Sequence, residues 1–204
     1  MKKLALLLLI VILCPTVLFA QNGKFNFGLN MKAGISQNFV SEDTKDEALF
    51  TPMFSSSVGG FCYWNFENND SEHSTLYQSL RFSMAYSKRG GFFDISGSVE
   101  KISFSYLDLE VMIPLTFSVS PDINLFLGIG GVASFITNQT SDTPKAEIFH
   151  PGILLEVGVS TRYGSHFGCQ FLSSYTTYEI HNIAITFGIS FSQVKAIRER
   201  EWTN

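Results

Sequence analysis

Histidine and serine are the side chains of this sequence that could carry hydrolytic chemistry, because a serine activated by a neighbouring histidine can attack an ester. The strand order inferred below brings His150 and His181 to one rim of the fold, where a serine partner would make a lipid-ester hydrolase. Exposed loop histidines are the simpler interpretation. No two of the four histidines have the spacing of metal ligands, and we expect neither a metal nor a cofactor. The remaining two are His73 and His166.

Acidic residues offer a second kind of chemistry. Asp108 and Glu110 are two residues apart, so they share one face of a strand, and paired carboxylates can act as acid and base. An uncompensated acid in a narrow interior is costly, and Arg81 on the adjacent strand is placed to pair with both. We therefore predict charge compensation rather than catalysis. The inward-facing network is predicted to contain Lys32, Arg81, Asp108, Glu110, Glu156 and Arg162.

Nucleotide-binding and nucleophile motifs are missing from the sequence. Gly128-Ile129-Gly130-Gly131 lacks the third-glycine spacing of a dinucleotide-binding loop and falls inside a predicted strand. There is no Walker motif and no nucleophile elbow. The net charge of −4 gives no strong basic balance for nucleic acid. We expect a protein that is not an enzyme and has no nucleic acid partner.

The elements that hold these residues alternate with a period of two, which is typical of β-strands. From Phe25 to Ser36, six apolar residues alternate with six polar residues or glycines, and Ile183 to Phe191 repeats the pattern. Their lengths suit tilted membrane-spanning strands. Between these two segments we predict six more strands, at residues 53–66, 76–87, 103–118, 125–135, 152–163 and 167–175.

The two faces of the predicted strands differ in chemistry. One face is apolar and uncharged, with residues such as Leu109 and Leu127, and the other carries glycine, serine, asparagine and a few charges. An eight-stranded interior is barely wide enough for side chains, so the apolar face cannot all point inward. Charged residues make up only 16% of the chain, against about 25% in soluble proteins. Cys62 and Cys169 fall on the apolar face of non-adjacent strands, and we expect no disulfide.

An open sheet edge in hydrocarbon would leave backbone groups unsatisfied, so the sheet must close. The sequence therefore predicts an all-β protein, an eight-stranded antiparallel up-and-down transmembrane β-barrel. Long connections at 37–52, 88–102 and 136–151 are predicted at the extracellular rim, and tight ones at 119–124 and 164–166 at the periplasmic rim.

The chain begins with a basic residue pair and an unbroken apolar run, which is typical of a secretory signal peptide. We predict a signal peptide at 1–20, an outer membrane β-barrel domain at 21–192 and a periplasmic tail at 193–204. The predicted location is the outer membrane, with outer membrane lipids as the first partner.

Nearly all of the predicted mature chain resembles a known family. The family is the PorT-like outer membrane β-barrel family of Bacteroidetes, and the segments that resemble it are Gly28–Gly34, Tyr106–Leu115, Leu125–Gly131, Gly152–Val159 and Ile183–Phe191. Thirteen residues follow Phe191, whereas such barrels commonly end on a terminal aromatic residue. A founding member of the family is associated with protein secretion, so the resemblance implies envelope or secretion-machinery proteins as further partners.

Three classes of function remain open at this point. The favoured class is a non-enzymatic barrel that acts through its extracellular loops in envelope structure, adhesion or assistance to protein secretion. The second is an outer membrane lipid-modifying enzyme, similar to a lipid A ester hydrolase. The third is a secreted soluble calyx that binds an apolar ligand.

Overall fold

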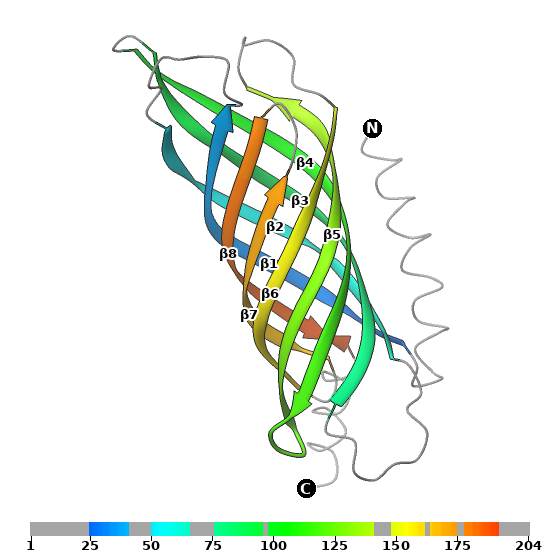
Figure 1. Ribbon diagram of the computed structural model, residues 1–204. Coiled ribbons are helices and arrows are strands. Elements are labelled where there is room, and N and C mark those ends of the chain that lie inside the picture. The colour runs from blue at the N-terminus through cyan, green and yellow to red at the C-terminus, as the bar shows by residue number, and fades with distance from the viewer. Residues whose placement is uncertain are drawn as a thin grey trace, which may run out of the picture.

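The computed structural model describes residues 25–40, 50–65, 76–95, 98–140, 148–161, 164–174 and 178–191. They form eight antiparallel strands that close into a barrel (Figure 1). The predicted fold class is confirmed, while the predicted signal peptide and tail lie outside the described residues. The strands are β1 (Phe25–Val40), β2 (Phe50–Asn65), β3 (Leu76–Ile95), β4 (Ser98–Ser118), β5 (Ile123–Gln139), β6 (Phe149–Thr161), β7 (His166–Ser174) and β8 (Tyr178–Ser190).

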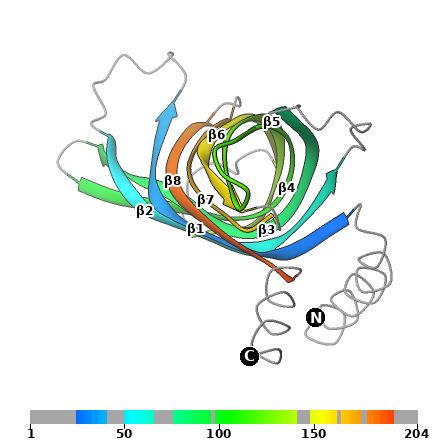
Figure 2. The same cartoon turned by 90° about the horizontal axis from the view of Figure 1, so that it is seen from below.

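The barrel closes between its first and last strands. Each strand pairs with its neighbour in the chain, and β1 pairs with β8 from Gly28–Ser190 to Val40–Tyr178. Figure 2 shows the resulting ring of strands. Closure satisfies backbone groups that hydrocarbon could not. Within the described part of the chain, no helix is long and apolar enough to cross a membrane.

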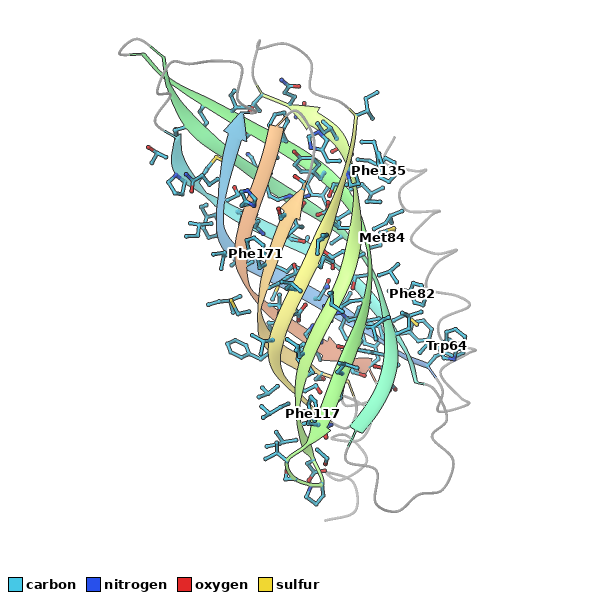
Figure 3. All side chains as sticks on the ribbon, viewed as in Figure 1. Trp64, Phe82, Met84, Phe117, Phe135 and Phe171 are labelled. Carbon is cyan, nitrogen blue, oxygen red and sulfur yellow. The ribbon has the colours of Figure 1, made fainter. Side chains whose placement is uncertain are left out.

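Alternation along the strands separates an apolar outside from a mostly polar inside. On the outer face Leu109 is 42% exposed and Leu127 is 54% exposed, whereas Asp108 between outward neighbours is 3% exposed. Figure 3 shows Trp64, Phe117 and other labelled side chains pointing away from the barrel. The predicted assignment of faces is therefore confirmed for these strands.

The connection predicted at 88–102 is wrong, because most of it is strand. β3 continues to Ile95 and β4 starts at Ser98, and the two pair up to Ile95–Ser98. The segment is rich in serine, aspartate, glycine and lysine, which is typical of a loop, but Gly90 packs inside a sheet. A Cβ atom there would lie 2.1 Å from the carbonyl oxygen of Ile102, so only glycine fits.

β3 and β4 are consequently the longest strands, with 20 and 21 residues. β5 stops at Gln139, opposite Phe104 of β4. The segments 90–95 and 98–103, which we call the projecting hairpin, therefore extend past β5 at the end opposite the first residue of β1 and the last of β8 (top of Figure 1). We call this the hairpin end and the other the terminal end.

The interior has three levels. A buried apolar cluster of Ile102, Phe104, Tyr106 and Ile180 fills the hairpin end. At the terminal end the ring of His166 packs edge-on against Phe61, with 5.0 Å between ring centroids, and Phe126 joins them. Charged side chains occupy the level between the two clusters.

Candidate functional site

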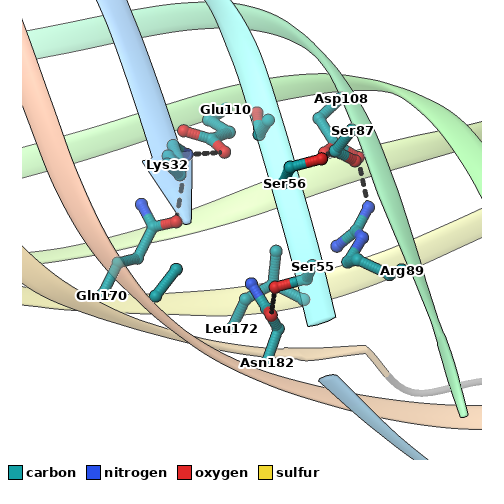
Figure 4. A pocket seen from close by; sticks show the side chains of 12 residues that line it. Lys32, Ser55, Ser56, Ser87, Arg89, Asp108, Glu110, Gln170, Leu172 and Asn182 are labelled. Atoms are coloured by element: carbon teal, nitrogen blue, oxygen red, sulfur yellow. Dashed lines mark hydrogen bonds and ion pairs between the residues drawn. The ribbon is translucent and has the colours of Figure 1, made fainter. Parts of the chain in front are cut away.

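The first element of the charged interior joins β1, β4 and β7. Lys32 of β1 forms an ion pair with Oε1 of Glu110 on β4. The same ammonium group donates a hydrogen bond of 3.0 Å to Oε1 of Gln170 on β7 (Figure 4). All three side chains are buried. Residues far apart in the sequence are thereby tied together across the lumen.

The second element is an ion pair between Arg81 of β3 and Glu156 of β6. Arg81 donates from Nη1 to Oε1 of Glu156 over 3.2 Å and from Nη2 to the other carboxylate oxygen. Glu156 also accepts hydrogen bonds from Thr186, over 3.0 Å, and from Gln170, over 3.1 Å. Gln170 therefore joins the first two elements into one network.

The third element lies nearer the hairpin end. Arg89 of β3 donates from Nη2 to Oδ1 of Asp108, over 2.5 Å, and to the hydroxyl oxygen of Ser134, over 3.0 Å. Its guanidinium carbon lies 4.3 Å from the centroid of the Tyr106 ring, a cation–π contact. Ser87 donates to the second oxygen of the same carboxylate over 2.5 Å. Buried ionised groups need such partners to offset desolvation.

The ion pairs differ from those expected from the sequence. Arg81 was expected to pair with Asp108 and Glu110 on the adjacent strand, but its direct neighbour on β4 is Met112. Its long side chain instead crosses the lumen to Glu156.

The membership of the network also differs in part. Lys32, Arg81, Asp108, Glu110 and Glu156 all face the interior, whereas Arg162 lies outside the described residues. Arg89 was missed because it falls in the segment assigned to a loop. With Arg89, three basic residues match three acidic ones among the buried side chains.

A small cavity lies between the first and third elements. It measures about 10 Å³, room for about one water molecule. Its lining includes Lys32, Glu110, Arg89 and Asp108 (Figure 4). Within the described ranges, no group of three histidine, cysteine, aspartate or glutamate residues could hold a metal ion. This cavity is lined by ion pairs and is too small for a substrate.

The histidines considered as a hydrolase pair do not share a site. His150 is buried inside the barrel, edge-on to Tyr106 at 5.6 Å between ring centroids. His181 lies on the outer face, stacked on Phe171 at 6.0 Å. The wall of the barrel separates them. A serine does lie beside His181, because Ser173 of β7 is its direct partner in the β7–β8 ladder.

Comparison with solved structures supports the architecture. The outer membrane enzyme PagL aligns with a TM-score of 0.51 and 10% identity over 78% of this chain and 98% of that one. The protein is an outer membrane β-barrel. This follows from the closed barrel and its apolar outer face, and PagL shows the same fold.

Two further solved structures are similar at lower scores. Ail of Yersinia pestis aligns with a TM-score of 0.42 and 13% identity over 82% of this chain and 99% of its own. The N-terminal β-barrel domain of Pseudomonas aeruginosa OprF aligns with a TM-score of 0.37 and 11% identity over 79% and 97%. No family model and no curated protein sequence matches the chain.

Proposed function

We propose that the protein is a non-enzymatic outer membrane barrel that acts through its hairpin end in envelope structure, adhesion or assistance to protein secretion. The observation that carries this proposal is the contrast between interior and rim. The interior is occupied by buried side chains and three ion pairs. The hairpin end, in contrast, presents strand beyond the wall of the barrel. A partner protein has access there and not in the lumen.

The proposed orientation places the hairpin end outside the cell. Outer membrane barrels have short periplasmic turns and longer extracellular segments. At the terminal end, β4 and β5 are joined by four residues, 119–122, and β6 and β7 by four, 162–165. The longest strands project at the other end. The partners we propose are outer membrane lipids around the wall and envelope or secretion-machinery proteins at the hairpin end, as the PorT-like resemblance implies.

A rescue experiment tests the proposal. A strain that lacks the protein is compared with its parent for secreted proteins and for outer membrane integrity. It is then complemented with the full chain or with a shortened chain in which Asp94–Val99 is replaced by Asn-Gly, a preferred two-residue hairpin turn that the pair Phe93–Glu100 would close. We expect the full chain to rescue and the shortened chain to insert normally but fail. Full rescue by the shortened chain would contradict a role for the hairpin end.

A lipid-ester hydrolase remains the second candidate, on one observation. Ser173 and His181 are directly opposite on neighbouring strands. His181 stacks on Phe171 of the outer face, and Ser173 is buried beside it, at 3% exposure. PagL, which shares the fold, is itself an outer membrane enzyme. Mass spectrometry of lipid A from cells with and without the protein distinguishes the candidates. A mass change that Ser173→Ala abolishes would replace the non-enzymatic proposal, and an unchanged lipid A would support it.

The soluble calyx does not fit the observed faces. A calyx buries its apolar face inward, whereas here residues such as Ile129 and Ile185, each 57% exposed, point outward. An outer surface of this kind is suited to lipid.

A further inference from the structure

One edge of the projecting hairpin has no partner strand in the described part of the chain. The β4–β5 ladder ends at Phe104–Gln139. The next residue, Thr140, donates its backbone N–H to the carbonyl oxygen of Ser103 over 3.1 Å and accepts from the Ser103 N–H on its hydroxyl oxygen over 3.2 Å. β4 nevertheless extends back to Ser98, paired only with β3 over this stretch.

The backbone groups on that edge follow from the geometry of antiparallel strands. Both backbone groups of Ser103 point toward the β5 side, since Thr140 bonds both. Alternate residues of an antiparallel strand direct their N–H and C=O groups to the same side. Val99 and Lys101 therefore present their donors and acceptors on this edge as well. Such an edge is a template for pairing with another strand.

We infer that the Val99–Lys101 edge of β4 docks an extended segment of another protein. That segment adds a strand antiparallel to β4, in line with β5 and beyond its last residue. The inference rests on the proposed function, because it names the surface and the kind of partner through which the hairpin end acts. The docked strand continues a ladder that the barrel already contains between β4 and β5.

Charge on the edge indicates the chemistry of the segment. Lys101 is exposed, and its ammonium group lies 5.9 Å from the centroid of the Phe92 ring on β3. An acidic residue of the partner directly opposite Lys101 would form a favourable cross-strand pair. The fitting partner is thus a β-forming segment with alternating side chains and an acidic residue at its centre.

A second copy of this chain fits the same edge poorly. In an antiparallel pair, edge-facing residues oppose one another. In the register with Lys101 opposite Lys101 of a second copy, two ammonium groups face each other. In the register with Lys101 opposite Val99, Glu100 of one copy lies opposite Glu100 of the other. Like charges directly opposite destabilise a sheet. Setting Val99 against Val99 leaves a single residue pair within the edge. A segment of different sequence avoids all three problems.

A binding experiment with a defined probe tests this inference. The probe is a short fluorescent peptide in which threonine and valine alternate around a central glutamate, and binding to the full-length protein in detergent micelles is followed by fluorescence anisotropy. Two control peptides carry a central lysine or N-methylated edge-facing amides. We expect the glutamate peptide to bind, the lysine peptide to bind more weakly, and the N-methylated peptide not to bind.

Backbone variants show whether binding uses the edge. Lys101→Pro removes the N–H that faces the edge and leaves the β3 ladder intact, so the peptide should bind on the order of tenfold more weakly. Lys101→Ala keeps the N–H and should lose only the preference for glutamate over lysine. Val99→Pro is the second edge variant, used if Lys101→Pro does not fold, as judged by faster gel migration of the unheated protein.

The outcomes separate this inference from the proposed function. Equal binding to the native chain and to the proline variant, or no binding of the glutamate peptide to the native chain, would overturn the edge inference. If the edge does not bind the peptide but the shortened hairpin still fails to rescue the strain, the proposed function is retained and only the edge inference is rejected. Edge-dependent peptide binding together with full rescue by the shortened hairpin would instead uphold the edge and reject the proposed function.

Discussion

The projecting hairpin is built from β3 and β4, which also supply Arg81, Arg89, Asp108 and Glu110 to the charged interior, yet the hydrogen-bonding groups of these strands are used differently in the two regions. In the wall, β3 and β4 are paired on both sides, and their inward side chains are matched by ion pairs such as Arg81–Glu156 and Arg89–Asp108. In the hairpin, β3 is the only strand among the described residues that pairs with β4. We therefore expect stability to reside in the wall and interior, and the proposed docking edge lies where pairing with the described strands stops.

The largest effect should come from removing one member of a buried ion pair. Glu156→Ala leaves the guanidinium of Arg81 without either carboxylate oxygen in a site that is 1% exposed. A buried charge that loses its partner destabilises by about 3–5 kcal/mol. We expect this loss in the free energy of unfolding, measured by denaturant titration in micelles. The double variant with Arg81→Met should recover much of it, and equal stability of single and double variants would contradict a structural ion pair.

A charge on the lipid face should have the next largest effect. Leu109→Arg places a guanidinium on the outer face near the middle of the bilayer, where it costs about 2–4 kcal/mol. Assembly should fall, as seen from less of the faster-migrating unheated form on a detergent gel. Lys101→Arg on the projecting hairpin is the matched control and should assemble normally. Ser103→Arg would not serve as this control, because Ser103 is buried and bonded to Thr140. Equal assembly of Leu109→Arg and Lys101→Arg would contradict the outward orientation of Leu109.

Substitution of Gly90 at the base of the hairpin should have a smaller effect on stability, and it tests whether this segment is strand or loop. A Cβ atom on Gly90 would lie 2.1 Å from the carbonyl oxygen of Ile102, whereas one on Gly131 would meet nothing closer than 3.7 Å. Gly90→Ala should therefore destabilise by about 1–3 kcal/mol through overpacking, and Gly131→Ala should be nearly neutral. The free energies of unfolding of both variants, measured by denaturant titration, test this difference. A neutral Gly90→Ala would restore the loop interpretation.

The smallest effect on stability should come from shortening the hairpin. Replacement of Asp94–Val99 by Asn-Gly removes strand that lies beyond β5 and leaves the interior ion pairs untouched. The free energy of unfolding should change by no more than about 0.5 kcal/mol, as for surface changes away from a core. A loss comparable with that of Glu156→Ala would show that the hairpin stabilises the barrel and would remove the contrast between the two regions.

Alternation was enough to predict the strands and their faces. The side-chain period of a strand is two, so within each strand the residues that alternate with the apolar face point inward. The charged residues at positions 32, 81, 108, 110 and 156 occupy such positions, and the structure places them inside the barrel. Strand order also follows, since an up-and-down barrel pairs each strand with its neighbour in the chain. These inferences need only local pattern and closure.

The partners of the charges and the extent of the hairpin could not be inferred in the same way. Adjacency along the sheet favours pairing of Arg81 with Asp108 and Glu110. A long side chain in a narrow lumen can instead reach across to another strand, where Glu156 lies. The hairpin is predicted as a loop because the segment is rich in serine, aspartate, glycine and lysine, and no period-two alternation marks its strands. The Ser96-Gly97 dipeptide is the better turn signal.

Planar bilayer recording tests the central claim most directly, namely that the interior stabilises the barrel and does not form a passage. Eight strands leave an interior just filled by side chains, and here Arg81, Tyr106, Met112, Leu154 and Glu156 are each at most 1% exposed. The purified protein should show no steady single-channel steps, and Glu110→Gln should lower stability without opening a channel. Reproducible conductance that Glu110→Gln alters would contradict the filled interior and, with it, the assignment of function to the hairpin end.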